Sequence, residues 1–97
     1  MTYIRRIMEL ADTYCPESRI FTSGEEARTV KDALGLDEMQ TELELRNMRD
    51  MTVLYYDRMI DTALAEEDAE DFDRLMSAMQ SITAVIDSVL WNRGYGV

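Results

Sequence analysis

Carboxylic acids crowd one short stretch of this chain, residues 65–73, which reads AEEDAEDFD. Six of the nine side chains are acids and none is basic. Carboxylates at this density could bind a cation, or could contact arginine and lysine side chains that otherwise hold phosphate. An EF-hand calcium loop is not supported, because the sixth position counted from Asp68 is Asp73 instead of glycine, and the twelfth is Met79 instead of glutamate. We therefore predict no metal site and no cofactor.

The acidic stretch continues backwards along the chain. Residues 57–73 hold eight acids and one arginine, a net charge of −7, and residues 37–44 hold four acids and no base. Asp57 and Asp61 are four residues apart, so on a helix their side chains lie about 6 Å apart, close to the phosphate spacing of a nucleic-acid strand. Two interpretations stay open: a surface that imitates nucleic acid toward a basic partner, or a solvated surface that keeps the protein soluble. The candidate partner-binding residues are Asp57, Asp61, Glu66, Glu67, Asp68, Glu70, Asp71 and Asp73.

Side chains suited to catalysis are scarce. The sequence has no histidine, which removes the usual general base and the usual metal ligand. The single cysteine, Cys15, therefore has no imidazole to activate it, and the four glycines are isolated instead of forming a phosphate-binding loop. We predict that the protein is not an enzyme. A lone cysteine cannot form an intramolecular disulfide, which fits a cytoplasmic location.

The net charge of −10 limits the partners. Nucleic acid and anionic membranes are both bound through clustered lysines and arginines, so we expect no direct nucleic-acid binding and no membrane binding. Residues 27–45 have the outline of a helix-turn-helix around Gly35, but four acids occupy the helix that would meet phosphate. These are Asp37, Glu38, Glu42 and Glu44. Charges interrupt every apolar run of residues 1–15, so we expect neither a signal peptide nor a membrane span there.

The composition predicts an all-α protein, since helix-favouring residues dominate and the chain has one proline and four glycines. Its 97 residues fit a single helical domain, residues 1–97. Apolar periodicity predicts four helices, over residues 2–13, 23–34, 37–66 and 69–92. Pro16 would end the first helix, Gly35 the second and Gly94 the fourth.

Capping signals indicate where the two long helices begin. Asp37, with Gln40 three residues later, has the spacing of a capping box that would begin the third helix. Asp68 can cap the fourth. Glu66 and Glu67 have no such explanation, because they lie at the negative end of the third helix, where each acid costs about 0.3–1 kcal/mol.

The helix predicted over residues 69–92 has the strongest periodicity, three consecutive heptads with apolar a and d positions. These positions are Phe72, Leu75, Met79, Ile82, Ile86 and Val89. Continuing the register backwards would place Arg58, Asp61 and Asp68 in the seam, which argues against one long helix. We therefore predict an antiparallel hairpin that turns near Glu67–Asp68, with the two short N-terminal helices packed on it as a small four-helix bundle.

Two faces of this hairpin could contact another helix. Residues 51–60 are apolar over most of a helix circumference, which indicates cover on more than one side. On the helix over residues 69–92, small side chains at spacings of 4, 3 and 4 lead to a tryptophan. This stripe is Ser77, Ser81, Ala84, Ser88 and Trp91. Either the first helix packs on the stripe, or a second molecule does.

The leading hypothesis is a non-enzymatic acidic protein-binding module. It would be a stoichiometric inhibitor or regulator that docks on a basic, nucleic-acid-binding surface of a larger protein. Phage-type anti-CRISPR and anti-restriction proteins act in this way, and the comparison is by class and composition, not by motif. The alternative is a self-associating structural or regulatory subunit, a homodimer through residues 51–60 and the small-residue stripe, whose acidic surface only confers solubility.

Overall fold

The computed structural model describes residues 3–13 and 24–95. All regular secondary structure in these two ranges is helical: α1 (Tyr3–Thr13), α2 (Gly24–Leu34), a short 3₁₀ helix η1 (Leu36–Glu38), α3 (Glu42–Ala65) and α4 (Ala69–Asn92). The predicted bounds of the first, second and fourth helices agree with these to within about one residue. Ser23, where the second helix was predicted to begin, lies outside the described residues, as do Cys15 and Pro16. No helix of the described chain is both long enough and apolar enough to cross a bilayer.

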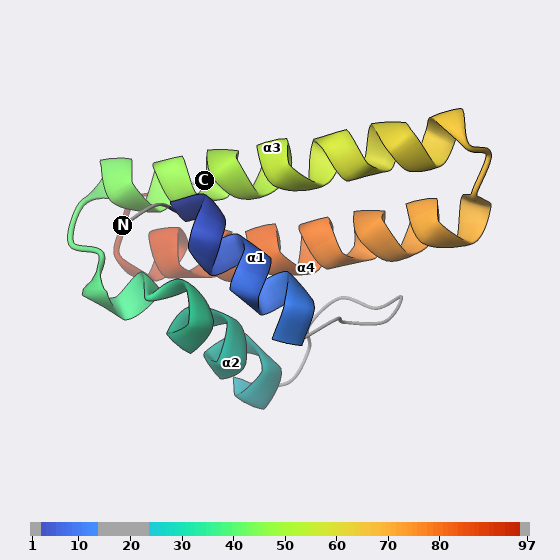
Figure 1. The fold of residues 1–97 in the computed structure, drawn as a ribbon. Helices are drawn as coiled ribbons and strands as arrows, with labels where there is room; N and C mark the ends of the chain where they lie inside the picture. The colour runs from blue at the N-terminus through green and yellow to red at the C-terminus, as the bar shows by residue number, and fades with distance from the viewer. Residues whose placement is uncertain (1–2, 14–23, 96–97) are drawn as a thin grey trace.

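The two long helices α3 and α4 run antiparallel and pack against each other, which confirms the predicted hairpin (Figure 1). Helix α1 packs on α2 and α3, and α2 also packs on α4. Both short helices lie across the end of the hairpin where α3 begins and α4 ends, while the opposite end extends beyond them (Figure 1). The molecule therefore measures 40 Å in its longest dimension and is less regular than a bundle of four aligned helices.

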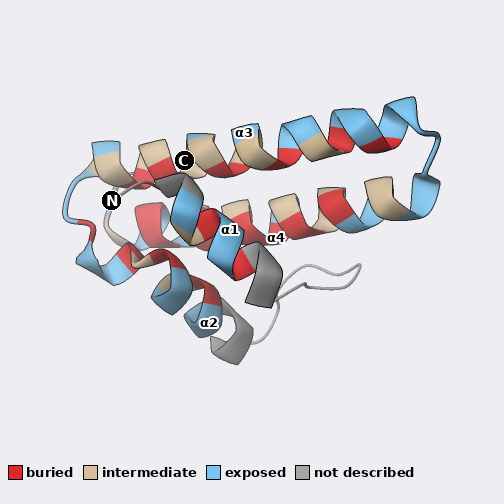
Figure 2. Ribbon diagram, viewed as in Figure 1, coloured by how far each residue is buried: buried red, intermediate tan, exposed pale blue. Residues whose placement is uncertain are grey.

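Each long helix buries one stripe of side chains in the hairpin. The stripe of α3 comprises Leu45, Met48, Thr52, Tyr56, Ile60 and Ala63. On α4 the heptad residues are buried except for Phe72 and Met79, which are half-buried. Figure 2 shows buried residues along the edges of α3 and α4 that face each other, and exposed residues on the opposite edge of α3. Burial of apolar area along these stripes is the main force that holds the hairpin together.

The start of α3 differs from the prediction. Asp37 does not cap this helix but lies in η1, and α3 begins at Glu42 with Thr41 as its N-cap. The Thr41 hydroxyl accepts a hydrogen bond from the Glu44 backbone N–H at 3.1 Å and donates one to the Glu44 carboxylate at 3.0 Å. The chain thus uses a second capping signal four residues after the predicted one, as a Thr–Glu pair three residues apart permits.

Long-range contacts explain why residues 36–40 stay out of α3. Leu36 and Met39 are buried in the core. Their backbone carbonyls accept hydrogen bonds from the guanidinium of Arg93, which follows α4. The Tyr95 hydroxyl lies 3.5 Å from the Gln40 carbonyl on the same segment. Because these carbonyls accept hydrogen bonds from Arg93, the segment can stay outside the α-helical hydrogen-bond pattern of α3.

Gly35 makes the turn between α2 and η1 possible. Its φ of 66° lies in the left-handed region that favours glycine. The Arg6 guanidinium from α1 donates a hydrogen bond to the Leu34 carbonyl at 2.8 Å, directly beside this glycine. A Cβ at position 35 would lie only 2.5 Å from Arg6 Nη1. The backbone conformation therefore favours glycine here, and the end of the Arg6 side chain occupies the space that a Cβ would fill.

Candidate functional site

The turn between α3 and α4 carries the centre of the acidic stretch. Helix α3 ends in a Schellman arrangement, in which the Asp68 N–H donates to the Ala63 carbonyl at 2.9 Å and the Glu67 N–H donates to the Leu64 carbonyl at 3.1 Å. This closure needs a left-handed residue at position 67, and Glu67 has a φ of 56°. Helices usually place glycine or asparagine at this position, so a glutamate here is unusual.

Two of the acids have a structural purpose at the start of α4. The Asp68 carboxylate accepts a hydrogen bond from the Asp71 backbone N–H at 3.0 Å, which confirms Asp68 as the predicted N-cap. The Asp71 carboxylate forms an ion pair with Arg74, one turn along the same helix. Glu70 lies beside them in the first turn of α4, where the helix dipole favours a negative charge.

The side chains of the other candidate acids are exposed and form no ion pair within the described residues. All eight candidate partner-binding residues are exposed except Asp71, which is half-buried. Among the described residues, the Asp71–Arg74 pair is the only ion pair that includes one of these eight acids. We define the acidic tip as Glu66, Glu67, Asp68, Glu70, Asp71 and Asp73, which the turn brings together at the extended end of the hairpin (Figure 1).

Asp57 and Asp61 stand apart from this tip. They lie on α3, nine and five residues before Glu66, which is about 14 Å and about 8 Å along a helix. Both carboxylates are exposed and one turn apart, as predicted. They extend the acidic surface along the side of the hairpin without joining the cluster at the turn.

The other acidic segment, residues 37–44, is used differently. Glu42 forms an ion pair with Arg46 at 2.6 Å, and Glu44 completes the capping pair with Thr41. Only Asp37 and Glu38 remain exposed in η1. The two ends of the hairpin therefore differ in how many carboxylates are left to solvent, and the tip has the larger number.

Chemistry at the tip is limited to charge and hydrogen bonding. Among the residues that the structure describes, no group of three histidine, cysteine, aspartate or glutamate side chains is placed to hold a metal ion. An open hollow at the turn is lined by Asp68, Glu70, Asp71 and Arg74, so one positive side chain of the chain lies among these acids. The exposed carboxylates can accept hydrogen bonds from arginine or lysine side chains of another molecule.

The small-residue stripe of α4 is divided by the fold. Ser81 is fully buried within the chain and has no surface to offer a second molecule, so it drops out of the predicted dimer contact. Ser77 is half-buried, whereas Ala84 and Ser88 are exposed, and Trp91 is 70% exposed. Helix α1, predicted as one cover for this stripe, packs mainly on α2 and α3 instead.

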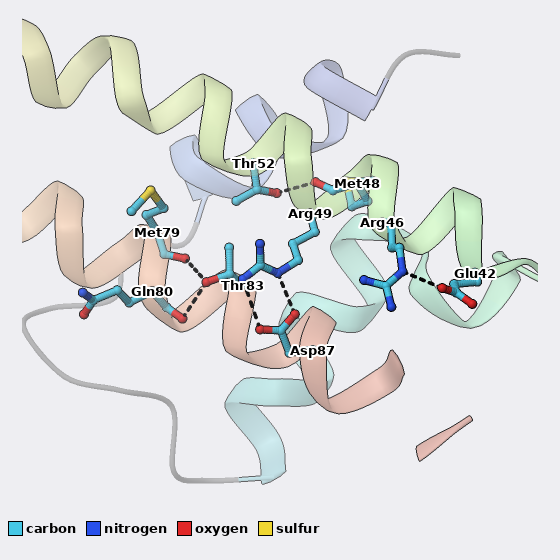
Figure 3. A network of polar contacts seen from close by, with 9 residues as sticks. All are labelled: Glu42, Arg46, Met48, Arg49, Thr52, Met79, Gln80, Thr83 and Asp87. Carbon is cyan, nitrogen blue, oxygen red and sulfur yellow. Dashed lines mark hydrogen bonds and ion pairs between the residues drawn. The ribbon is translucent and has the colours of Figure 1, made fainter. Parts of the chain in front are cut away.

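An ion pair between the long helices escaped the sequence analysis. Arg49 on α3 and Asp87 on α4 meet with Nε and Oδ1 2.7 Å apart, and a second guanidinium nitrogen lies 3.4 Å from the other carboxylate oxygen (Figure 3). Nearby, the Thr83 hydroxyl donates to carbonyls of its own helix, at 2.9 Å from Met79 and 3.1 Å from Gln80. Both charged residues flank the apolar seams, and this is the position from which oppositely charged residues pair across packed helices.

Comparison with known proteins gives no family for this chain: no family model matches it, and neither a curated protein nor a solved structure does.

Proposed function

We propose that this chain is a non-catalytic binding protein that docks its acidic tip on a basic surface of a larger protein. The exposed carboxylates would take the place of nucleic-acid phosphates against arginine and lysine side chains, so that the complex blocks or regulates the partner stoichiometrically. Phage-type anti-CRISPR and anti-restriction proteins act by this kind of docking. Charge complementarity of this sort mainly speeds association and gives it a steep salt dependence.

Support comes above all from the turn at Glu67. A left-handed backbone costs a residue with a side chain about 1–2 kcal/mol, and glycine would avoid this strain. The chain nevertheless places a glutamate there, next to Glu66 at the negative end of α3. Carboxylates are thus kept at the tip at the expense of stability, which is typical of positions that serve binding.

The test compares two variants of equal charge. The tip variant carries Glu66→Gln, Glu67→Gln and Glu70→Gln, and it keeps Asp68 and Asp71, which the fold uses. The control variant carries Asp32→Asn, Asp37→Asn and Glu38→Gln at exposed positions of α2 and η1. Each change removes three negative charges, so both variants have a formal net charge of −7 instead of −10.

The native chain and each variant are used as bait in a lysate of the cells in which the protein occurs. Captured proteins are then purified and their binding is measured. We expect a basic protein that binds the native chain and the control, loses at least about 10-fold in affinity for the tip variant, and is displaced by duplex DNA. Affinity should also fall by at least about 10-fold between roughly 50 and 500 mM salt. A partner that binds both variants equally, or binds with no salt dependence, would contradict docking through the tip.

A further inference from the structure

Helix α3 has a mostly exposed face on the side away from α4 (Figure 2). Successive residues of this face are spaced 4, 3, 4, 4, 3 and 4 positions apart, which keeps them in one strip of the helix surface. We define the outer face of α3 as Leu43, Asn47, Asp50, Leu54, Arg58, Asp61 and Ala65. All are exposed except Asn47, which is half-buried, and Leu43 and Leu54 are 68% and 46% exposed.

The residues of the outer face of α3 are spaced symmetrically before and after Leu54. The two residues at each distance from Leu54 have side chains that can bind each other. Asp50 and Arg58, which carry charges of opposite sign, each lie four residues from Leu54. An amide and a carboxylate lie seven residues before and after Leu54. Two apolar side chains lie eleven residues before and after it. These outer pairs are Asn47 with Asp61, and Leu43 with Ala65.

We propose that a second copy of this chain docks antiparallel on this face, with the two Leu54 side chains meeting at a two-fold axis. In such an isologous contact, if one residue meets a second, the second also meets the first. Asp50 of each copy therefore lies opposite Arg58 of the other, which gives two ion pairs. Asn47 of each copy donates a hydrogen bond to the opposite Asp61 carboxylate, and Leu43 packs on Ala65 at both ends.

The charges of the face match a second copy better than they match the chain itself. Asp50 and Arg58 are eight residues apart, about 12 Å along α3, so they cannot pair with each other. Neither forms an ion pair with another residue of the described ranges. A parallel arrangement in register would oppose Asp50 to Asp50 and Arg58 to Arg58, so only the antiparallel one brings unlike charges together.

Shape also permits the contact. A hollow of about 290 Å³ lies beside Leu54 and is lined by Leu54, Tyr55, Arg58 and Met59. Grooves between such rows of side chains accept the ridge of a neighbouring helix, with axes about 8–10 Å apart. The contact would run from residue 43 to residue 65, about 33 Å along the helix. One pair of helices buries a modest area, so we expect a reversible dimer.

This dimer goes beyond the proposed function and does not depend on it, and the outer face of α3 shares no residue with the acidic tip. The test is sedimentation equilibrium of the native chain, of Arg58→Asp, of Asp50→Arg and of the double variant that carries both changes. We expect each single change to weaken the dimer by at least about 10-fold, because the symmetry replaces two attractions with two repulsions. The double variant restores both ion pairs with exchanged signs and should regain the native dimerisation constant to within about 3-fold.

A pair of leucine variants provides the matched control. Leu54→Lys puts two like charges on the axis and should abolish the dimer, whereas Leu64→Lys changes a similarly exposed leucine of the same helix, about 80° away from the outer face, and should leave the dimer intact. Circular dichroism checks that each variant keeps its helices. A native chain that stays monomeric up to about 1 mM overturns the proposal. So does a dimer that the charge exchange fails to restore, or one that Leu54→Lys leaves intact.

Discussion

Helices α3 and α4 end in the same hydrogen-bond pattern but with different residues at the left-handed position. After α4, the Tyr95 N–H donates to the Leu90 carbonyl at 3.0 Å and the left-handed residue is Gly94, with a φ of 83°. After α3, the pattern is the same and the left-handed residue is Glu67. Glycine is the residue that most helices use there. Glu67, which replaces the usual glycine, lies at the end of the hairpin that is rich in exposed acids.

The surroundings of the two turns differ in the same way. Near the end of α4, Arg93 donates hydrogen bonds to the segment between α2 and α3, and Leu36 and Met39 of that segment are buried. At the tip, residues 64–70 are all exposed, and neither α1 nor α2 covers them (Figure 1). The comparison suggests that one end of the hairpin supplies most of the stability while the other presents charge.

The largest effect should come from the buried end. Leu36→Ala removes a side chain with no exposed area and leaves a cavity, so we expect a loss of about 2–4 kcal/mol in the free energy of unfolding. Leu64→Ala, the same change at a leucine that is 56% exposed near the tip, should cost less than about 0.5 kcal/mol. Urea unfolding followed by circular dichroism measures both. Equal losses would mean that the two ends share the stability evenly.

Exchanging the residue type at the two turns should have opposite effects. Glu67→Gly relieves the left-handed strain and should stabilise the chain by about 0.5–1 kcal/mol, after the extra entropy of glycine in the unfolded chain is subtracted. Gly94→Ala should destabilise it by about 1 kcal/mol through its φ alone, because no atom lies within 4 Å of the added Cβ. Thermal unfolding of both variants gives the signs. A Glu67→Gly variant less stable than the native chain would show that the glutamate has a structural role.

The smallest effect concerns the middle of the hairpin. The side chains of Arg49 and Asp87 are 37% and 26% exposed, so solvent screens their attraction. A double-mutant cycle with Arg49→Met and Asp87→Asn should give a coupling free energy of about 0.5–1 kcal/mol. Arg46 and Glu42, within one helix, are the reference pair and should couple by about 0.3–0.5 kcal/mol. A coupling below that of the reference pair would assign the hairpin's stability to its apolar seam alone.

Signals from neighbouring residues predicted most helix bounds correctly. The features that depend on contacts between distant residues could not be predicted. The bounds of α4 follow from its heptads, and the end of α2 follows from Gly35. The start of α3 was wrong because two capping signals compete between residues 37 and 44, and the choice depends on Arg93, more than fifty residues further along the chain. No local pattern reveals such a contact.

In the candidate site, too, the features set by neighbouring residues were predicted and those set by the folded structure were not. Asp68 was predicted as the cap of α4, because its oxygen needs only a nearby backbone N–H. The left-handed conformation of Glu67 could not be predicted, since the sequence around the turn contains no glycine to mark it. The spacing of Ser81 identified a stripe but not which part of it would be buried. The symmetry of the outer face about Leu54 can be recognised only once exposure separates it from the buried seam.

The hydrogen bonds from Arg93 also have a consequence for the order of folding. Helices α3 and α4 are neighbours in the sequence, so their contacts can form as soon as both are made. The hydrogen bonds to the carbonyls of Leu36 and Met39 can form only after Arg93 has been synthesised, because its guanidinium is their donor. A ribosome makes α1 and α2 first, yet we expect them to settle last, against a hairpin that is already formed.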